Sequence, residues 1–284
     1  MLDVSRRVAV LGTLLLIIAV LSGCGQPSSE TSGQGTGETG KLILTGSSTV
    51  APLAQEIGQR FEAVHPGIRV DVQTGGSSRG IADARAGTAT IGMVSRALKA
   101  DEADLTAHSI ALDGICVILH ATNPIESLTD AQVRSIYRGE TSRWSGVGGD
   151  DSTITVVNKA EGRSTLELFL AYYGLKSDEI QASVVIGDNE QGIKTVSTNP
   201  DAIGYVSIGA AEFAALDGVP IKLLPLGGVT PSTENLKNGT YPLSRPLNLV
   251  TRGAPGAVAR KFIDFAQSAA VNDLITGLYY VPLT

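Results

Sequence analysis

Short apolar runs alternate along this chain with longer amphipathic runs, and this alternation constrains the fold more than any other feature. Apolar residues recur at helical spacing between the short runs, as at Leu53, Ile57 and Phe61. The short runs have the length of strands and lie at residues 42–44, 68–72, 91–94, 114–119, 154–157, 203–206 and 247–250. The pattern therefore predicts an α/β fold of open, mainly parallel sheets with helices on both faces.

The part of the chain that carries this pattern begins near residue 41 and is longer than a typical domain of about 100–200 residues. We therefore expect two lobes. The chain is 43% hydrophobic and 18% charged, as is usual for a globular protein. Its net charge of -6 argues against a nucleic-acid partner and provides no long-range attraction for an anion. Any bound anion must therefore be held by local donors.

The N-terminal segment has the features of an export signal. Arg6 and Arg7 precede an apolar run at 8–21, which is shorter than the roughly 20 residues needed to span a bilayer. The run ends in Ser-Gly-Cys at 22–24, a pattern that resembles a bacterial lipobox. We expect a signal peptide at 1–23, lipidation of Cys24 and a flexible tether at 24–40. The protein would then be extracytoplasmic and lipid-anchored to a bacterial membrane, with the general or twin-arginine export route left open.

Glycines and hydroxyl residues cluster at three places where a predicted strand runs into a predicted helix. These clusters occupy residues 45–49, 73–80 and 158–165. In an open parallel sheet, such turns gather at the carboxyl edge, where ligands bind. The three clusters are therefore candidates for one shared site.

The chemistry of these turns suits an anion. A helix N-terminus presents unpaired backbone N–H groups and the positive end of the helix dipole, and serine and threonine add hydroxyl donors. Basic side chains lie in or near the clusters, at Arg79, Arg96, Lys159 and Arg163. The sequence thus predicts a site for a compact tetrahedral oxyanion. Simple helix capping by Ser and Thr stays an alternative, because spacing does not show that the clusters meet.

Several motifs now make the chain recognisable. Residues 45–52 and 75–80 resemble the first two anion-binding turns of the periplasmic phosphate-binding proteins that serve the phosphate ABC importer. Further similarity lies at 136–144, 201–206 and 241–247. The order of the motifs matches that family from about residue 41 to residue 283, which is nearly the whole mature chain.

This resemblance implies a two-lobed periplasmic-binding-protein fold of type II with a hinge of crossover strands. The first lobe would comprise 41–119 and 244–284, and the second 120–243. The protein would be a monomer that captures inorganic phosphate between its lobes and delivers it to the permease of an ABC importer. The resemblance implies no enzyme activity, no cofactor and no metal.

The resemblance also implies which residues bind the ligand. Lys159 stands where the family has an arginine, and Ser95 where many phosphate binders have an aspartate that accepts the proton of the ligand. Sulfate, molybdate or tungstate therefore stay open as alternative ligands. The expected ligand-binding residues are Ser47, Ser48, Thr49, Ser77, Ser78, Ser95, Arg96, Lys159, Arg163, Ser164 and Thr165.

The same residues suggest two rival functions. Residues 76–80 fit the Gly-x-Ser-x-Gly turn of α/β-hydrolases, but such an enzyme needs a histidine base. The histidines are His65, His108 and His120, and none lies in the C-terminal half, where the hydrolase order would place the base. A sensor or adhesion lipoprotein with the same fold stays open, because a fold does not determine its function.

Overall fold

The strands form a mixed sheet in the order β2-β1-β3-β9-β4-β7-β5-β6, with β8 paired to β4. The computed structural model describes residues 39–283, so Cys24 and the predicted signal peptide lie outside the described residues. The strands are β1 (Gly40–Gly46), β2 (Ile68–Thr74), β3 (Ile91–Val94), β4 (Leu105–His120), β5 (Thr155–Lys159), β6 (Val184–Ile186), β7 (Ala202–Ser207), β8 (Ile221–Leu223) and β9 (Ser244–Arg252).

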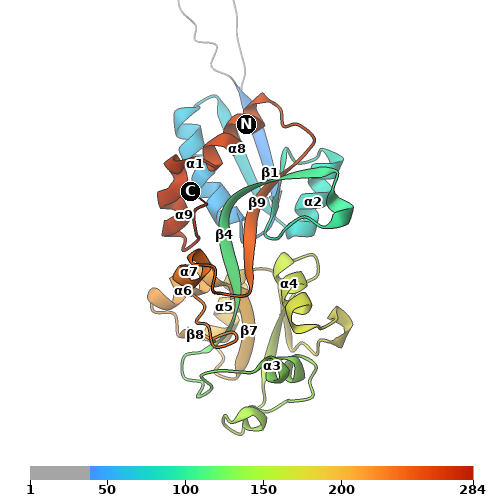
Figure 1. Cartoon of the computed structure of the whole chain (residues 1–284), viewed down its shortest axis with the longest axis vertical. Coiled ribbons are helices and arrows are strands. Elements are labelled where there is room, and N and C mark those ends of the chain that lie inside the picture. The colour runs from blue at the N-terminus through green and yellow to red at the C-terminus, as the bar shows by residue number, and fades with distance from the viewer. Residues whose placement is uncertain (1–38, 284) are drawn as a thin grey trace, which may run out of the picture. The chain divides into compact units, whose positions relative to one another are not determined.

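Helices connect these strands and cover the sheet (Figure 1). Within residues 39–283, no helix is both long enough and apolar enough to cross a membrane. The α-helices are α1 (Ala51–Val64), α2 (Ser77–Ala86), α3 (Asp130–Tyr137), α4 (Ser164–Tyr173), α5 (Asn189–Ser197), α6 (Ile208–Leu216), α7 (Thr233–Lys237), α8 (Ala257–Ala266) and α9 (Asn272–Gly277). The 3-10 helices are η1 (Ala100–Glu102), η2 (Trp144–Val147), η3 (Ser177–Glu179) and η4 (Ala269–Val271).

The predicted α/β fold class is confirmed, and every predicted strand is present. β6 and β8 were not predicted, because three residues are too few to show an apolar period. Pairing is parallel between β1 and its neighbours β2 and β3, and between β5 and its neighbours β6 and β7. It is antiparallel wherever β4 or β9 takes part, so the sheet is more mixed than the sequence pattern indicated.

The long strands β4 and β9 explain why parallel and antiparallel pairing are combined in this sheet (Figure 1). β4 pairs with β9 from Leu105 to Gly114 and then with β7 from Ile115 to Leu119. The chain thus leaves one group of strands along β4 and returns to it along β9. Two segments that run out and back along the same path must pair antiparallel.

The described residues form two large hydrophobic cores, one on each side of this exchange, and a third, smaller cluster that includes Ile81, Val94 and Leu105. The first core includes Leu44, Leu53 and Phe61 with Leu249 from β9, and the second includes Ile118 from β4 with residues such as Phe169 and Tyr205. β4 enters the second core at Ile115. The lobe boundaries expected at residues 119 and 243 stay predictions.

Glycines allow α2 to lie directly against the backbone of β1 and β3. A Cβ added at Gly80 would lie 2.7 Å from the carbonyl oxygen of Met93 and 2.8 Å from that of Thr45. Gly46 has a φ of +131°, and a Cβ there would lie 2.3 Å from the same Met93 oxygen. Only glycine permits so close an approach. The packing therefore holds the N-terminus of α2 beside the ends of both strands.

Candidate functional site

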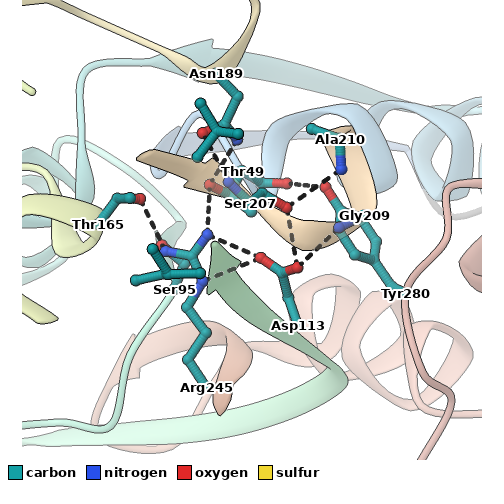
Figure 2. Close-up of polar contacts among 12 residues, drawn as sticks. Thr49, Ser95, Asp113, Thr165, Asn189, Ser207, Gly209, Ala210, Arg245 and Tyr280 are labelled. Carbon is teal, nitrogen blue, oxygen red and sulfur yellow. Dashed lines mark hydrogen bonds and ion pairs between the residues drawn. The ribbon is translucent and has the colours of Figure 1, made fainter. Parts of the chain in front are cut away.

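A buried arginine on β9 forms the centre of the candidate site. Arg245 is only 2% exposed, and its Nε and Nη2 donate to Oδ2 of Asp113 on β4 at 3.0 Å and 2.8 Å. Asp113 is fully buried, and its Oδ1 accepts from the Ser207 hydroxyl at 2.9 Å and from the Gly209 amide at 3.3 Å. The pair is thus anchored on both strands that pass between the cores (Figure 2).

The rest of the guanidinium group reaches hydroxyls from distant parts of the chain. Nη1 donates to Oγ1 of Thr165 on α4 at 2.9 Å and to Oγ of Ser95, just after β3, at 3.4 Å. Nη2 donates to Oγ1 of Thr49, in the turn after β1, at 3.3 Å. Figure 2 shows these side chains around the arginine. We call the group the Arg245 cluster: Ser47, Thr49, Ser77, Ser95, Asp113, Thr165, Asn189, Ser207 and Arg245.

Two further serines tie the first two glycine and hydroxyl turns to this cluster. Ser47 Oγ accepts the backbone N–H groups of Thr49 and Val50, so its own hydroxyl hydrogen donates to Ser95 Oγ at 3.0 Å. Ser77 Oγ accepts from the Ser95 amide at 3.2 Å. Residues from all three predicted turns therefore meet, as the argument for a shared site required.

The helix starts beside the cluster carry unpaired donors. α2 begins at Ser77 and α4 at Ser164, and neither helix has a side-chain cap. The Arg163 Nε and Ser164 Oγ atoms are buried and have no hydrogen-bond partner in the described structure. Buried donors without partners are costly, and a helix N-terminus favours negative charge. The arrangement is therefore suited to bind an oxyanion.

Lys159 contacts the Arg245 cluster through Asn189. Its amino group is buried and donates to the carbonyl oxygen of Asp188 at 2.6 Å and to Oδ1 of Asn189 at 3.0 Å. Asn189 in turn donates to Thr49 Oγ1 at 3.2 Å. Burial, and then the nearby charge of Arg245, lowers the pKa of Lys159 to about 7. The lysine therefore loses much of its charge near neutral pH when no anion is present.

Arg96 is engaged by carboxylates. It is 4% exposed, and its Nη1 and Nη2 donate to Glu102 at 2.7 Å and 2.8 Å, while its Nε lies 2.9 Å from Glu167 Oε2. That Nε contact is short but is not aligned as a hydrogen bond. Two carboxylates neutralise the charge of Arg96, so these contacts do not support its predicted role as an anion ligand.

The remaining predicted residues lie at the edge of the cluster. Ser78 is exposed, and its hydroxyl donates to Glu167 Oε1 at 3.4 Å. Ser48 is half-buried and lines a cavity of about 210 Å³ together with Asp188 and Asn189. Binding roles for all eleven predicted residues stay predictions. Five of them belong to the Arg245 cluster, namely Ser47, Thr49, Ser77, Ser95 and Thr165, and Lys159 contacts it through Asn189.

Sequence reasoning missed Arg245 and Asp113 as site residues. Each interrupts or flanks an apolar strand run, at 114–119 for Asp113 and at 247–250 for Arg245. A charged residue beside such a run is a usable signal, because buried charges are normally paired. Their pairing across 132 positions of sequence becomes visible only in the fold.

The described residues give the rival hydrolase reading no catalytic pair. Ser78, the serine of that turn, donates to Glu167 Oε1. His120 contacts Thr122, His108 contacts Thr251, and within residues 39–283 neither these nor His65 is bonded to Ser78. Within residues 39–283, no three His, Cys, Asp or Glu side chains gather in a way that could hold a metal ion.

Known proteins resemble this chain along nearly its whole length. Residues 27–270 match the model of the PBP superfamily domain. The phosphate-binding protein PstS of Bacillus subtilis is 25% identical over 283 residues, covering 97% of this chain and 92% of that protein.

Solved structures resemble the fold closely. A substrate-binding protein assigned to a phosphate ABC transporter of Clostridium perfringens, solved with bound phosphate, is 30% identical with a TM-score of 0.79, covering 86% of this chain and all of that one (100%). An ABC-type phosphate transport receptor from Vibrio cholerae is 29% identical with a TM-score of 0.71, covering 84% of this chain and 99% of that one.

Proposed function

The chain belongs to the PBP superfamily and is PstS-like, and we propose that it captures inorganic phosphate outside the cell and delivers it to an ABC importer in the membrane. The Arg245 cluster is the observation that carries this proposal. It gathers hydroxyl groups from three separate turns around the buried Arg245–Asp113 pair. Such a set of convergent donors suits a small anion with four oxygens.

We propose that the two cores belong to two lobes that close over the phosphate. Contacts between the two sides support this closure: the Ser78 amide donates to the Gly162 carbonyl oxygen at 3.2 Å, and Glu167 on α4 pairs with Arg96. β4 and β9 would serve as the hinge. We place the change of lobe near Gly114, where β4 exchanges β9 for β7, a few residues before the predicted position at 119. The protein's role is then capture and transfer, with no chemical step.

Calorimetric titration of the purified protein with phosphate, after removal of carried-over anion, tests the site. One phosphate should bind per chain. Ser77→Ala removes one charge-assisted hydrogen bond, and we expect binding to weaken about ten- to a hundredfold. Ser145→Ala is the control, because that exposed hydroxyl donates to Asp151 and, within residues 39–283, to no member of the Arg245 cluster. The absence of phosphate binding in the unsubstituted protein would refute the proposal.

We also propose that Cys24 carries the lipid that holds the protein at the membrane. The motif at 22–24 supports this, together with the short apolar run before it. Mass spectrometry of the N-terminal peptide from membranes would detect acyl chains on Cys24. A Cys24→Ala variant should appear in the soluble fraction, and an unmodified cysteine in membrane-extracted protein would contradict the assignment.

A further inference from the structure

The last residues of the described chain lie between the two sides of the molecule. α9 packs in the first core through Ile275, and α6 packs in the second core through Ala211. Figure 1 shows α9 just above α6. After α9 the chain passes from one core to the other, because Tyr280 belongs to the first core and its neighbour Val281 to the second. Consecutive Cα atoms are about 3.8 Å apart, so this segment has no slack. We call residues 279–281 the C-terminal strap.

The C-terminal strap is bonded to β4 and packed against α6. Val281 and Leu112 on β4 exchange two backbone hydrogen bonds, at 2.8 Å and 3.0 Å, close to the point where β4 exchanges β9 for β7. A Cβ added at Gly209 on α6 would lie 2.7 Å from the Tyr279 carbonyl oxygen and 2.8 Å from Cε1 of Tyr280. A larger residue at this position would therefore push against the strap.

The backbone of the strap is strained. Within residues 39–283, Tyr279 is the only residue other than glycine that has a positive φ, at +57°. A bulky residue keeps this left-handed conformation only where its surroundings enforce it. The Tyr279 ring packs on Phe213 of α6 with the ring centres 6.0 Å apart, and its carbonyl oxygen lies 3.2 Å from Thr233 Oγ1 of α7. Contacts from the second side thus hold the strained residue in place.

The strap also reaches the first anion-binding turn. The Tyr280 hydroxyl donates to the Thr49 carbonyl oxygen at 2.9 Å, and both residues are buried (Figure 2). The side chain of the same threonine accepts hydrogen bonds from Asn189 and Arg245. Thr49 is therefore fixed by the Arg245 cluster through its side chain and by the strap through its backbone.

A hollow lies on each side of the strap, and the walls of both hollows come from both cores. One has a volume of about 460 Å³ and lies between Pro52 of α1 and the helices α5 and α6, which contribute Ile193 and Ala214. The other has a volume of about 590 Å³ and lies between Thr276 of α9 and Lys237 of α7. On this face, the strap is therefore a narrow bridge between the two sides.

We propose that the C-terminal strap is a third connection between the two sides, besides β4 and β9, and that Tyr280 is a positioning residue that couples this connection to the turn at Thr49. The inference rests on the proposed function, because Thr49 lies at the proposed phosphate site. Movement of α6 would press on the strap at Gly209 and so shift the Thr49 carbonyl group. Phosphate held at the turn would in return steady the strap, because coupling between two sites is reciprocal.

Calorimetric titration of the purified protein with phosphate tests the role of Tyr280. Tyr280→Phe keeps the ring and leaves the buried Thr49 carbonyl oxygen without its donor, so we expect phosphate to bind about three- to thirtyfold more weakly. Tyr241→Phe is the matched control, because that hydroxyl is also buried and donates to the Ile115 carbonyl oxygen at 2.9 Å within the second core. It should lower the melting temperature by a similar amount and leave the affinity unchanged. Equal affinities for the two variants would overturn the inference.

A second substitution disturbs the strap from the opposite side. Gly209→Ala should also weaken phosphate binding, whereas Gly277→Ala should not, because a Cβ at Gly277 has no atom within 4 Å. If both effects pass through the strap, the double variant Gly209→Ala/Tyr280→Phe should bind phosphate no more than about twofold more weakly than the weaker single variant. Losses that multiply would show two independent effects and count against the coupling.

Hydrogen exchange on the unsubstituted protein tests the coupling without any substitution. Phosphate should slow amide exchange in residues 279–281 more than in α8 of the first core, and this extra protection should disappear in Tyr280→Phe. Equal protection of the two segments in the unsubstituted protein would refute the coupling and leave the proposed function standing. If phosphate does not bind the unsubstituted protein at all, the proposed function itself fails. The exchange measurement decides the question even if Tyr280→Phe does not fold.

Discussion

Replacing Glu167 by glutamine should weaken phosphate binding without unfolding the protein, because this carboxylate joins the two sides of the site. Glu167 lies on α4, which packs on the second core through Phe169. Its Oε2 atom lies 2.9 Å from Arg96 Nε and 2.7 Å from Lys99 Nζ, and both of those residues follow β3 of the first core. These ion pairs can exist only while the two sides are together.

The size of the effect follows from burial. The Arg96 side chain is 4% exposed and that of Glu167 is 24% exposed, so solvent screens their attraction only in part. Arg96 keeps its two bonds to Glu102 in the variant, which lowers the cost of losing its second carboxylate. Lys99 is half-exposed and adds little. We expect a loss of about 1–2 kcal/mol, which corresponds to about a five- to thirtyfold increase in the dissociation constant.

Calorimetry and stopped-flow dissociation would measure this change, and we expect most of it in the dissociation rate because the contact holds the closed form. Glu179→Gln is the matched control. It removes an Arg138 pair at 3.2 Å that lies within one side of the molecule, so the affinity should not change. Unchanged phosphate affinity in Glu167→Gln, with an unchanged melting temperature, would refute the view that these pairs stabilise closure.

Three more outcomes can be measured directly. Asp113→Asn leaves a buried arginine without its counter-ion, and urea unfolding should show a loss of about 3–5 kcal/mol; a loss below about 1 kcal/mol would contradict the buried pair. Gly76→Ala places a Cβ 2.6 Å from the Gly162 carbonyl oxygen, at a φ of +93°. Gly87→Ala is the control, because φ there is +72° and the added Cβ has no atom within 4 Å. Titration should show weaker phosphate binding for Gly76→Ala than for Gly87→Ala, and equal affinities would rule out this steric effect. The pKa of Lys159 falls from 10.5 in the free side chain to about 7 in the fold, so between these pH values the unfolded chain binds more protons than the folded one. In denaturant titrations, stability should therefore rise with pH across that window relative to Lys159→Met, by up to about 1.4 kcal/mol per pH unit. Parallel pH profiles for the two proteins would exclude the shift.

The local patterns that the sequence displays were sufficient for the fold class. Continuous apolar runs predicted β1, β3 and β9 correctly, because a strand that is buried on both faces of a sheet is apolar along its length. The turn at 45–49 is rich in hydroxyl residues, which predicts both a helix start and a source of hydrogen-bond donors. The strands β6 and β8 were not predicted, because an apolar period cannot be recognised in three residues.

The order of the antiparallel pairs and the centre of the site depended on tertiary structure. Arg245 and Asp113 become a pair only because β4 and β9 run side by side. Arg96 looked equivalent to Arg163 in sequence, yet it lies against Glu102 and Glu167, while Arg163 keeps a buried Nε without a partner. Which cation is neutralised and which stays available is set by neighbours that are distant along the chain.

The sequence by itself determined the elements, the type of turn and the class of ligand those turns favour, because each depends on residues within a few positions of one another. Only the tertiary structure decided which hydroxyls gather around Arg245 and in which direction each hydrogen bond runs. A hydroxyl can donate or accept, and its role is settled by the groups that surround it in space.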